Sequence, residues 1–258
     1  MKRQILLTIA YDGTNYSGYQ IQKNGISVSE KLNKAAGRLV GKPVSVLCVS
    51  RTDAGVHALG QRGSFFLENN IPVERIPRAL QCYLPDDIMI LKAEEIPLDF
   101  YPPAESVGKH YRYVVRLAHE SNPFDHRYVW HLPRKIEKQR ILEAIPYLEG
   151  EHDFKAFTAK HSGKDNFVRK VNRIFLSQRG DDLIFDVWGE GFLYKMVRSI
   201  VGFLLDVGRG HFEPALAKTL LVTGERERLG YTAPSRGLTL VKIYFDEKFY
   251  LDMEHNLG

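Results

Sequence analysis

The chain has 258 residues, which is enough for one large domain or two modest ones. Hydrophobic residues make up 44% and charged residues 26%, values near the globular average that exclude collagen-like, disulfide-scaffold and wholly disordered chains. Lys and Arg total 36 against 31 for Asp and Glu, and the net charge of +5 mildly favours polyanionic partners.

The first hundred residues alternate between strand and helix signals. A run rich in β-favouring residues, 5–11, ends at the turn signal 12–15. Ser27 and Glu30 have the spacing of a capping box, and apolar residues at helical spacing then predict a helix that stops at Gly41. We expect further strands over 44–49, 61–67 and 88–95, a loop over 50–58 and a helix over 75–83.

A domain boundary is predicted at Pro102 and Pro103, because two consecutive prolines cannot continue a helix or a central strand. The expected organisation is therefore an N-terminal α/β domain over 1–103, a C-terminal α/β domain over 104–245 and an acidic tail over 246–258. We expect the tail to be a peripheral extension outside the chemistry.

The second half combines a hairpin with helices. Alternation from 109 to 117 predicts a half-buried strand with Tyr111 on its apolar face, and the widest apolar stripe predicts a helix over 193–207. The other expected elements are helices over 136–148 and 214–222, a hairpin over 168–189 and a strand over 238–245. This mixture predicts an α+β fold in two similar α/β halves, with mixed, mainly antiparallel sheets flanked by helices.

The location of the protein is suggested by its cysteines and its apolar runs. Cys48 and Cys82 lie in apolar stretches and form no CxxC pair, which is typical of a reducing compartment. The run 5–10 is too short for a secretory signal, and the window 192–207 contains three charged residues and is too short for a membrane span. We therefore expect a cytoplasmic protein without a membrane segment.

Several catalytic motifs are absent from the sequence. It contains no Walker A loop, no GxGxxG after the first strand, no HExxH, no CxxC and no GxSxG. Their absence argues against nucleotide-binding, dehydrogenase and zinc-protease functions.

The loop 50–58 is the best candidate for a catalytic site. Asp53 beside Arg51 could act as a nucleophile or base, because a nearby cation would keep the carboxylate ionised. The same residues also suit an Asp-Ala-Gly turn with a surface ion pair. His57 could share a metal ion with Asp53, but no third or fourth ligand is evident.

Two further residues could face a cleft. Arg198 falls at the edge of the apolar stripe of its helix, so it either pairs with an anion such as Asp53 or extends to solvent. Tyr111 is either a core residue or a ring that stacks on an extruded base. Basic and aromatic residues between 160 and 173 either follow an RNA backbone or form a solvated face: Lys160, His161, Lys164, Phe167, Arg169, Lys170 and Arg173.

Four segments in order resemble the TruA-type tRNA pseudouridine synthase family. They are Tyr11-Asp12-Gly13-Thr14 with Gly18-Tyr19-Gln20, then Arg51-Thr52-Asp53-Ala54-Gly55-Val56-His57-Ala58, then Lys109-His110-Tyr111-Arg112-Tyr113, and finally 192–208 with Met196-Val197-Arg198. The resemblance covers about residues 3–245. Ser50 stands where the family usually has glycine, and Tyr19 where it usually has tryptophan. Neither departure removes a reactive group, so they bear on local backbone shape and RNA-loop packing more than on activity.

The resemblance implies conversion of uridine in RNA to pseudouridine, an isomerisation that requires no cofactor and no metal. Asp53 matches the essential aspartate of the family, and Tyr111 matches its substrate-stacking tyrosine. Arg198 matches the arginine that pairs with the aspartate, and Arg51 an arginine linked to nucleotide extrusion. Whether Asp53 attacks the sugar carbon or removes a ribose proton stays open.

The resemblance also implies the substrate and the assembly. These are the uridines at positions 38, 39 and/or 40 of the tRNA anticodon stem-loop, and a homodimer with an active-site cleft between the two halves of each chain. Two alternatives remain. One is an RNA-binding or tRNA-folding protein without chemistry, which would tolerate Asp53→Asn, and the other is a metal-dependent phosphohydrolase that uses Asp53 and His57.

Overall fold

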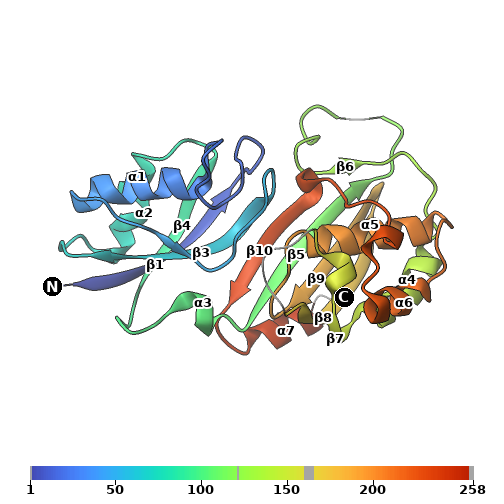
Figure 1. Ribbon diagram of the computed structural model, residues 1–258. Coiled ribbons are helices and arrows are strands. Elements are labelled where there is room, and N and C mark those ends of the chain that lie inside the picture. The colour runs from blue at the N-terminus through green and yellow to red at the C-terminus, as the bar shows by residue number, and fades with distance from the viewer. Residues whose placement is uncertain (1, 121, 160–165, 256–258) are drawn as a thin grey trace. The chain divides into compact units, whose positions relative to one another are not determined.

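The computed structural model describes residues 2–120, 122–159 and 166–255. The chain forms two compact units, each of which contains strands and helices (Figure 1). Unit 1 comprises Met1–Val107 and Thr239–Glu247, and unit 2 comprises Gly108–Leu238 and Lys248–Gly258. This division differs from the expected one, because a late strand returns to the first unit and the residues after it belong to the second.

Unit 1 contains a mixed sheet with the strand order β4-β1-β3-β10. β1 (Arg3–Tyr11) lies antiparallel to both β3 (His57–Leu67) and β4 (Ile88–Ile96). The short β2 (Leu47–Cys48) also pairs antiparallel with β3, whereas β10 (Leu238–Tyr244) pairs parallel with it. The strand expected over 44–49 is therefore mostly loop.

Helices α1 (Val28–Val40) and α2 (Ile76–Gln81) lie over one face of this sheet (Figure 1). The Ser27 side chain accepts a hydrogen bond from the Glu30 amide, and Gly41 ends α1 with a φ of 80°. Both predicted end signals of α1 are confirmed. Pro102 begins the short helix α3 (Pro102–Glu105), a position that a proline tolerates because its missing amide has no helical partner there.

The strands of unit 2 have the order β5-β9-β8-β7. The neighbours pair antiparallel, and β6 pairs parallel with β5. The strands are β5 (Gly108–Arg116), β6 (Trp130–His131), β7 (Gly150–Asp153), β8 (Val168–Arg179) and β9 (Asp182–Gly189). The predicted hairpin is formed by β8 and β9, and the α+β class with mainly antiparallel sheets is confirmed.

The helices α4, α5 and α6 gather on one side of the sheet of unit 2 (Figure 1). Their bounds are Lys138–Leu148, Met196–Gly208 and Leu216–Thr223. α5 starts three residues later than expected because Lys195 has a φ of 61°, in the left-handed region outside a helix. Every residue of α5 except Arg198 is buried, so this helix forms the centre of the core of unit 2.

The C-terminal segment is not peripheral. It forms α7 (Lys248–His255), in which the Phe249 side chain is fully buried. A Cβ atom at Gly108 would lie 2.4 Å from the Phe249 ring, so the helix packs directly against the start of β5. Within the described ranges, no helix is long and apolar enough to cross a membrane. Cys48 is half-buried and Cys82 is exposed, and both are free thiols.

Candidate active site

Asp53 lies in the loop that connects β2 and β3 in unit 1. Its side chain is half-buried, and the Arg51 side chain is exposed. The Val56 amide donates to the Asp53 carbonyl at 3.2 Å, and Gly55 has a φ of 74° that favours glycine. The loop therefore contains the tight turn that the Asp-Ala-Gly sequence predicts, with the Asp53 carboxyl at its beginning.

The opening segment, residues 11–19, holds this loop on both sides of Asp53. Thr52 shares a 2.7 Å hydrogen bond with the Tyr11 hydroxyl, and its carbonyl accepts from the Tyr19 amide at 3.1 Å. After Asp53, the Gly55 amide donates to the Tyr16 carbonyl at 3.2 Å. The first two motifs of the sequence thus form one structure.

Two glycines allow these segments to approach each other. A Cβ atom at Gly13 would lie 2.0 Å from the Val56 carbonyl oxygen, and one at Gly18 would lie 2.8 Å from the Thr52 carbonyl oxygen. Gly18 also has a φ of 103°. Both positions require glycine because a side chain would push the opening segment away from the loop.

Gln61 is a supporting residue that the sequence analysis missed. Its buried side-chain amide donates to the Ser50 carbonyl at 2.6 Å and accepts from the Ser50 amide at 3.3 Å. The backbone at Ser50 is therefore fixed by β3. Tyr19 is also buried, with its ring 6.3 Å from the Tyr11 ring, so it packs inside unit 1.

Tyr111 lies on β5 in unit 2. Its ring is 6% exposed and meets the edge of the Phe192 ring at 5.4 Å and 89°. The next residue on the same face, Tyr113, is buried and donates its hydroxyl to the Pro234 carbonyl at 2.7 Å. The pKa of Tyr113 is raised above its ordinary value of 10.0. Burial is the largest cause, and the nearby Arg198 guanidinium opposes it.

Arg198 is the half-buried member of α5. Its Nε donates to the Ala233 carbonyl at 2.7 Å, and its own carbonyl accepts from the Ala233 amide at 3.1 Å. A Cβ atom at Gly202, one helical turn later, would lie 2.3 Å from the Tyr231 carbonyl oxygen. The segment 231–233 therefore runs tightly along α5 and fixes one edge of the guanidinium, a role that the sequence analysis did not assign.

The predicted site residues are divided between the units. Unit 1 holds Arg51 and Asp53, and unit 2 holds Tyr111 and Arg198. Within the ranges that the structure describes, no three His, Cys, Asp or Glu side chains are grouped to hold a metal ion. The described residues therefore supply no third ligand for the metal ion that Asp53 and His57 could share according to the sequence.

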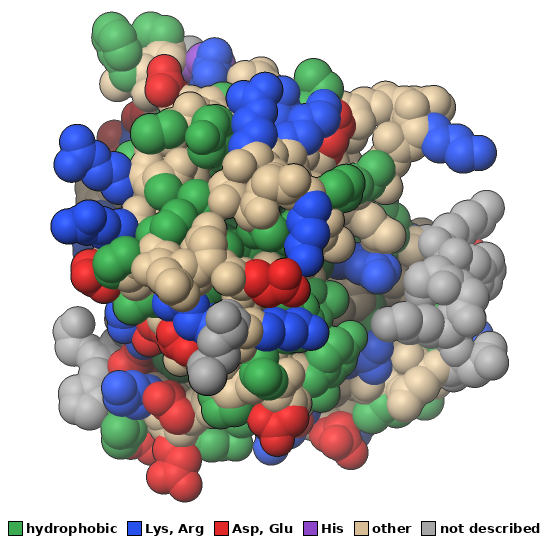
Figure 2. Space-filling view, turned by 90° about the vertical axis from the view of Figure 1, so that its left-hand side faces the viewer, with side chains coloured by type: hydrophobic (Ala, Val, Ile, Leu, Met, Phe, Trp, Pro, Cys, Tyr) green, Lys and Arg blue, Asp and Glu red, His purple; other side chains and the backbone are tan. Residues whose placement is uncertain are grey.

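The predicted basic cluster lies only partly within the described residues. Lys160, His161 and Lys164 lie outside them. The remaining basic members, on β8, are half-buried, and Lys170 pairs with Glu190 at 3.1 Å. On the face seen in Figure 2, Lys and Arg side chains form several separate groups with acidic side chains between them.

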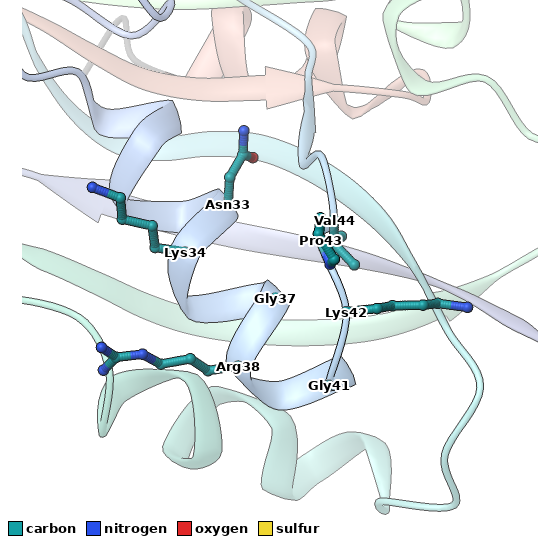
Figure 3. Close-up of a pocket in the computed structure, with 8 residues that line it drawn as sticks. All are labelled: Asn33, Lys34, Gly37, Arg38, Gly41, Lys42, Pro43 and Val44. Carbon is teal, nitrogen blue, oxygen red and sulfur yellow. The ribbon is translucent and has the colours of Figure 1, made fainter.

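A groove of about 740 Å³ lies at the end of α1 in unit 1 (Figure 3). Three of its lining residues are cationic, and each is already engaged. Lys34 pairs with Glu30 at 2.5 Å, Lys42 pairs with Glu68 at 3.0 Å, and Arg38 lies 5.6 Å from the centre of the Tyr83 ring. None of the four predicted site residues lines this groove.

Comparisons with known proteins identify relatives along most of the chain. A family model described as tRNA pseudouridine synthase matches residues 7–102 and 144–246. A protein named tRNA pseudouridine synthase A from Geotalea uraniireducens is 41% identical over 243 residues, which span 94% of this chain and 100% of the relative. A protein of the same name from Exiguobacterium sibiricum is 41% identical over 95% of this chain and 98% of its own length.

Among solved structures, a chain of a "Cbf5-Nop10-Gar1 Complex" aligns with 93% of this chain and 59% of its own length, at 13% identity and a TM-score of 0.37.

Proposed function

This chain belongs to the tRNA pseudouridine synthase family, and we propose that it isomerises uridine at positions 38, 39 and/or 40 of the tRNA anticodon stem-loop without a cofactor. Members of the family are isomerases that convert uridine to pseudouridine. The observation that best supports the proposal is the loop of Asp53, which the opening segment holds on both sides through Thr52 and Gly55.

Asp53 starts the proposed reaction. It either attacks the ribose C1′ carbon or removes a ribose proton, and the N-glycosidic bond breaks. The freed uracil turns within the site and its C5 atom bonds to C1′. On the first route this bond displaces the Asp53 carboxylate from C1′, and on the second route the proton that Asp53 removed returns to the ribose. The C5 proton leaves to a base such as Tyr111 or a water molecule, and N1 takes up a proton. Substrate and product are isomers and the rearrangement is redox-neutral overall, so the reaction itself needs no redox cofactor.

The other three residues prepare this step in the proposal. Tyr111 stacks on the extruded base, an interaction of about 1–3 kcal/mol that offsets much of the few kcal/mol needed to unstack a nucleotide. Arg198 keeps Asp53 ionised, because an adjacent cation favours the carboxylate. The exposed Arg51 assists extrusion of the nucleotide.

The proposal also covers the oligomeric state, the location and the partner of the enzyme. It acts as a homodimer in the cytoplasm, with tRNA as its partner. Two subunits present twice the net charge of +5 to the RNA, which favours binding of a polyanion at low salt.

The test is tritium release from tRNA labelled as 5-³H-uridine, with excess chelator present. The proteins are the wild type, Asp53→Ala and the matched control Asp99→Ala, whose carboxylate is exposed in unit 1. We expect release by the wild type and the control and none by Asp53→Ala. Sequencing of the product then maps the modified positions.

Other outcomes would decide against the proposal. Binding of tRNA without release by the wild type would favour the RNA-binding alternative. Release that stops in chelator would favour metal-dependent chemistry.

A further inference from the structure

His57 is a buried residue at the start of β3, four positions after Asp53. Its side chain is only 3% exposed. The Gly13 amide donates a hydrogen bond to His57 Nδ1 at 3.1 Å. His57 Nδ1 is the acceptor in this bond, because a backbone amide can only donate.

A carboxylate lies beside the same nitrogen. Asp12 Oδ1 is 3.1 Å from His57 Nδ1, and it also accepts from the Thr14 amide at 2.9 Å and from the Thr14 hydroxyl at 2.5 Å. Asp12 thereby folds the turn that aims the Gly13 amide at His57. The turn and the ring form one connection between the opening segment and β3.

This connection is at a point where the two segments approach each other closely. Gly13 has no room for a side chain beside the Val56 carbonyl oxygen, so its amide reaches the imidazole directly. The Tyr11 hydroxyl holds Thr52 before Asp53, and the Tyr16 carbonyl holds Gly55 after it. The bond from Gly13 to His57 closes the far end of the same loop.

We propose that His57 is a positioning residue, which acts through the Gly13 amide to hold the loop 52–57 in the conformation that aims the Asp53 carboxylate at the ribose. The inference rests on the proposed function, in which Asp53 starts the reaction. His57 itself touches no substrate, because its ring is enclosed by protein. Its contribution is the position of the acceptor atom Nδ1.

Two amide variants test the position of that atom. In His57→Asn, the side-chain oxygen occupies nearly the place of Nδ1, whereas in His57→Gln it lies one bond farther from the backbone. We expect kcat in His57→Gln to fall by about 100-fold, the order expected for a displacement of about 1 Å at a reacting group. We expect KM for tRNA to change by less than about threefold, and His57→Asn to keep most of the wild-type kcat.

A second measurement tests the hydrogen bond from the Gly13 amide to His57 without relying on enzyme activity. Hydrogen exchange of the Gly13 amide is measured by NMR in the wild type and both variants, after circular dichroism has established that each is folded. We expect exchange at least about tenfold faster in His57→Gln and near wild type in His57→Asn, because only the asparagine keeps the acceptor in place.

The two measurements separate failure of this inference from failure of the proposed function. If the wild type releases no tritium, the proposed function fails, and the inference fails with it. If the wild type is active but His57→Gln keeps its kcat, or His57→Asn fails as badly as His57→Gln, the positioning role is wrong. Unchanged Gly13 exchange in a folded His57→Gln would also overturn it.

Discussion

His110 Nε2 lies 2.6 Å from Asp186 Oδ1, and both side chains are buried. They lie on the face of β5 and β9 opposite to Tyr111, because successive strand residues alternate between faces. Arg112 adds two hydrogen bonds to the same carboxylate, at 2.8 and 3.0 Å, and the Trp188 ring stacks on His110 at 4.1 Å. A charged and aromatic cluster thus supports the strand that carries Tyr111.

This cluster predicts loss of stability in acid. Burial lowers the pKa of His110 below its ordinary 6.5, although the hydrogen bond with Asp186 opposes that shift. Burial alone would raise the pKa of Asp186, but hydrogen bonds from His110 and Arg112 hold it below the ordinary 3.8. At both groups the folded state binds fewer protons than the unfolded state, so stability falls as the pH drops below about 6.5 and again below about 3.8.

The measurement is the free energy of unfolding in urea between pH 7.5 and 5.5. His110→Gln removes the titrating group, so its stability should decline less over this range than that of the wild type. His126, which is exposed, supplies the control His126→Gln, and that variant should keep the wild-type slope. Equal slopes for all three proteins would contradict the assignment to His110.

Helix α7 contributes to stability through Phe249. Phe249→Ala removes a fully buried ring and should cost about 3–5 kcal/mol in the free energy of unfolding. The control is Leu251→Ala in the same helix, where the side chain is 52% exposed and the expected cost is below about 1 kcal/mol. Similar urea midpoints for the two variants would mean that α7 is the peripheral tail expected from its acidic composition.

Much of the fold was predictable because its signals are local. Ser27 and Gly41 determine the two ends of α1 through their own hydrogen bond and backbone conformation. The alternation around Tyr111 likewise reflects a strand with one buried face. Four short motifs identified the family, and the comparisons confirmed it.

The differences come from contacts between residues that are distant in the sequence. β10 pairs with β3 through Thr239 and His57, a partnership that no local pattern encodes. His110 is buried, although it lies on the polar side of the alternation, because its Nε2 forms a hydrogen bond with Asp186 on the neighbouring strand. Gln61 and the segment 231–233 were missed for the same reason, since their partners, Ser50 and Arg198, lie elsewhere in the chain.

Tyr111 offers a test of stacking against hydroxyl chemistry. Tyr111→Phe keeps the ring and should change the Kd for tRNA by less than about threefold. Tyr111→Ala removes the stacking surface and should weaken binding by about 5- to 150-fold, which corresponds to 1–3 kcal/mol. Both Kd values are measured by filter binding with the Asp53→Asn background to prevent turnover. A Phe variant that binds as weakly as the Ala variant would show that stacking is not the contribution of Tyr111.

Arg198 predicts a change in the pH dependence of the reaction. If its guanidinium keeps Asp53 ionised, Arg198→Ala should raise the apparent pKa of the acidic limb of the single-turnover rate by about 1–3 units. Arg198→Lys keeps the charge but loses the Nε donor that Ala233 accepts, so its profile should lie between those of the wild type and Arg198→Ala. The rates are measured from pH 5 to 9 at saturating enzyme. An acidic limb that is unchanged in Arg198→Ala would refute the pairing, whereas a shift in the alanine variant with partial recovery in the lysine variant would assign the effect to positive charge.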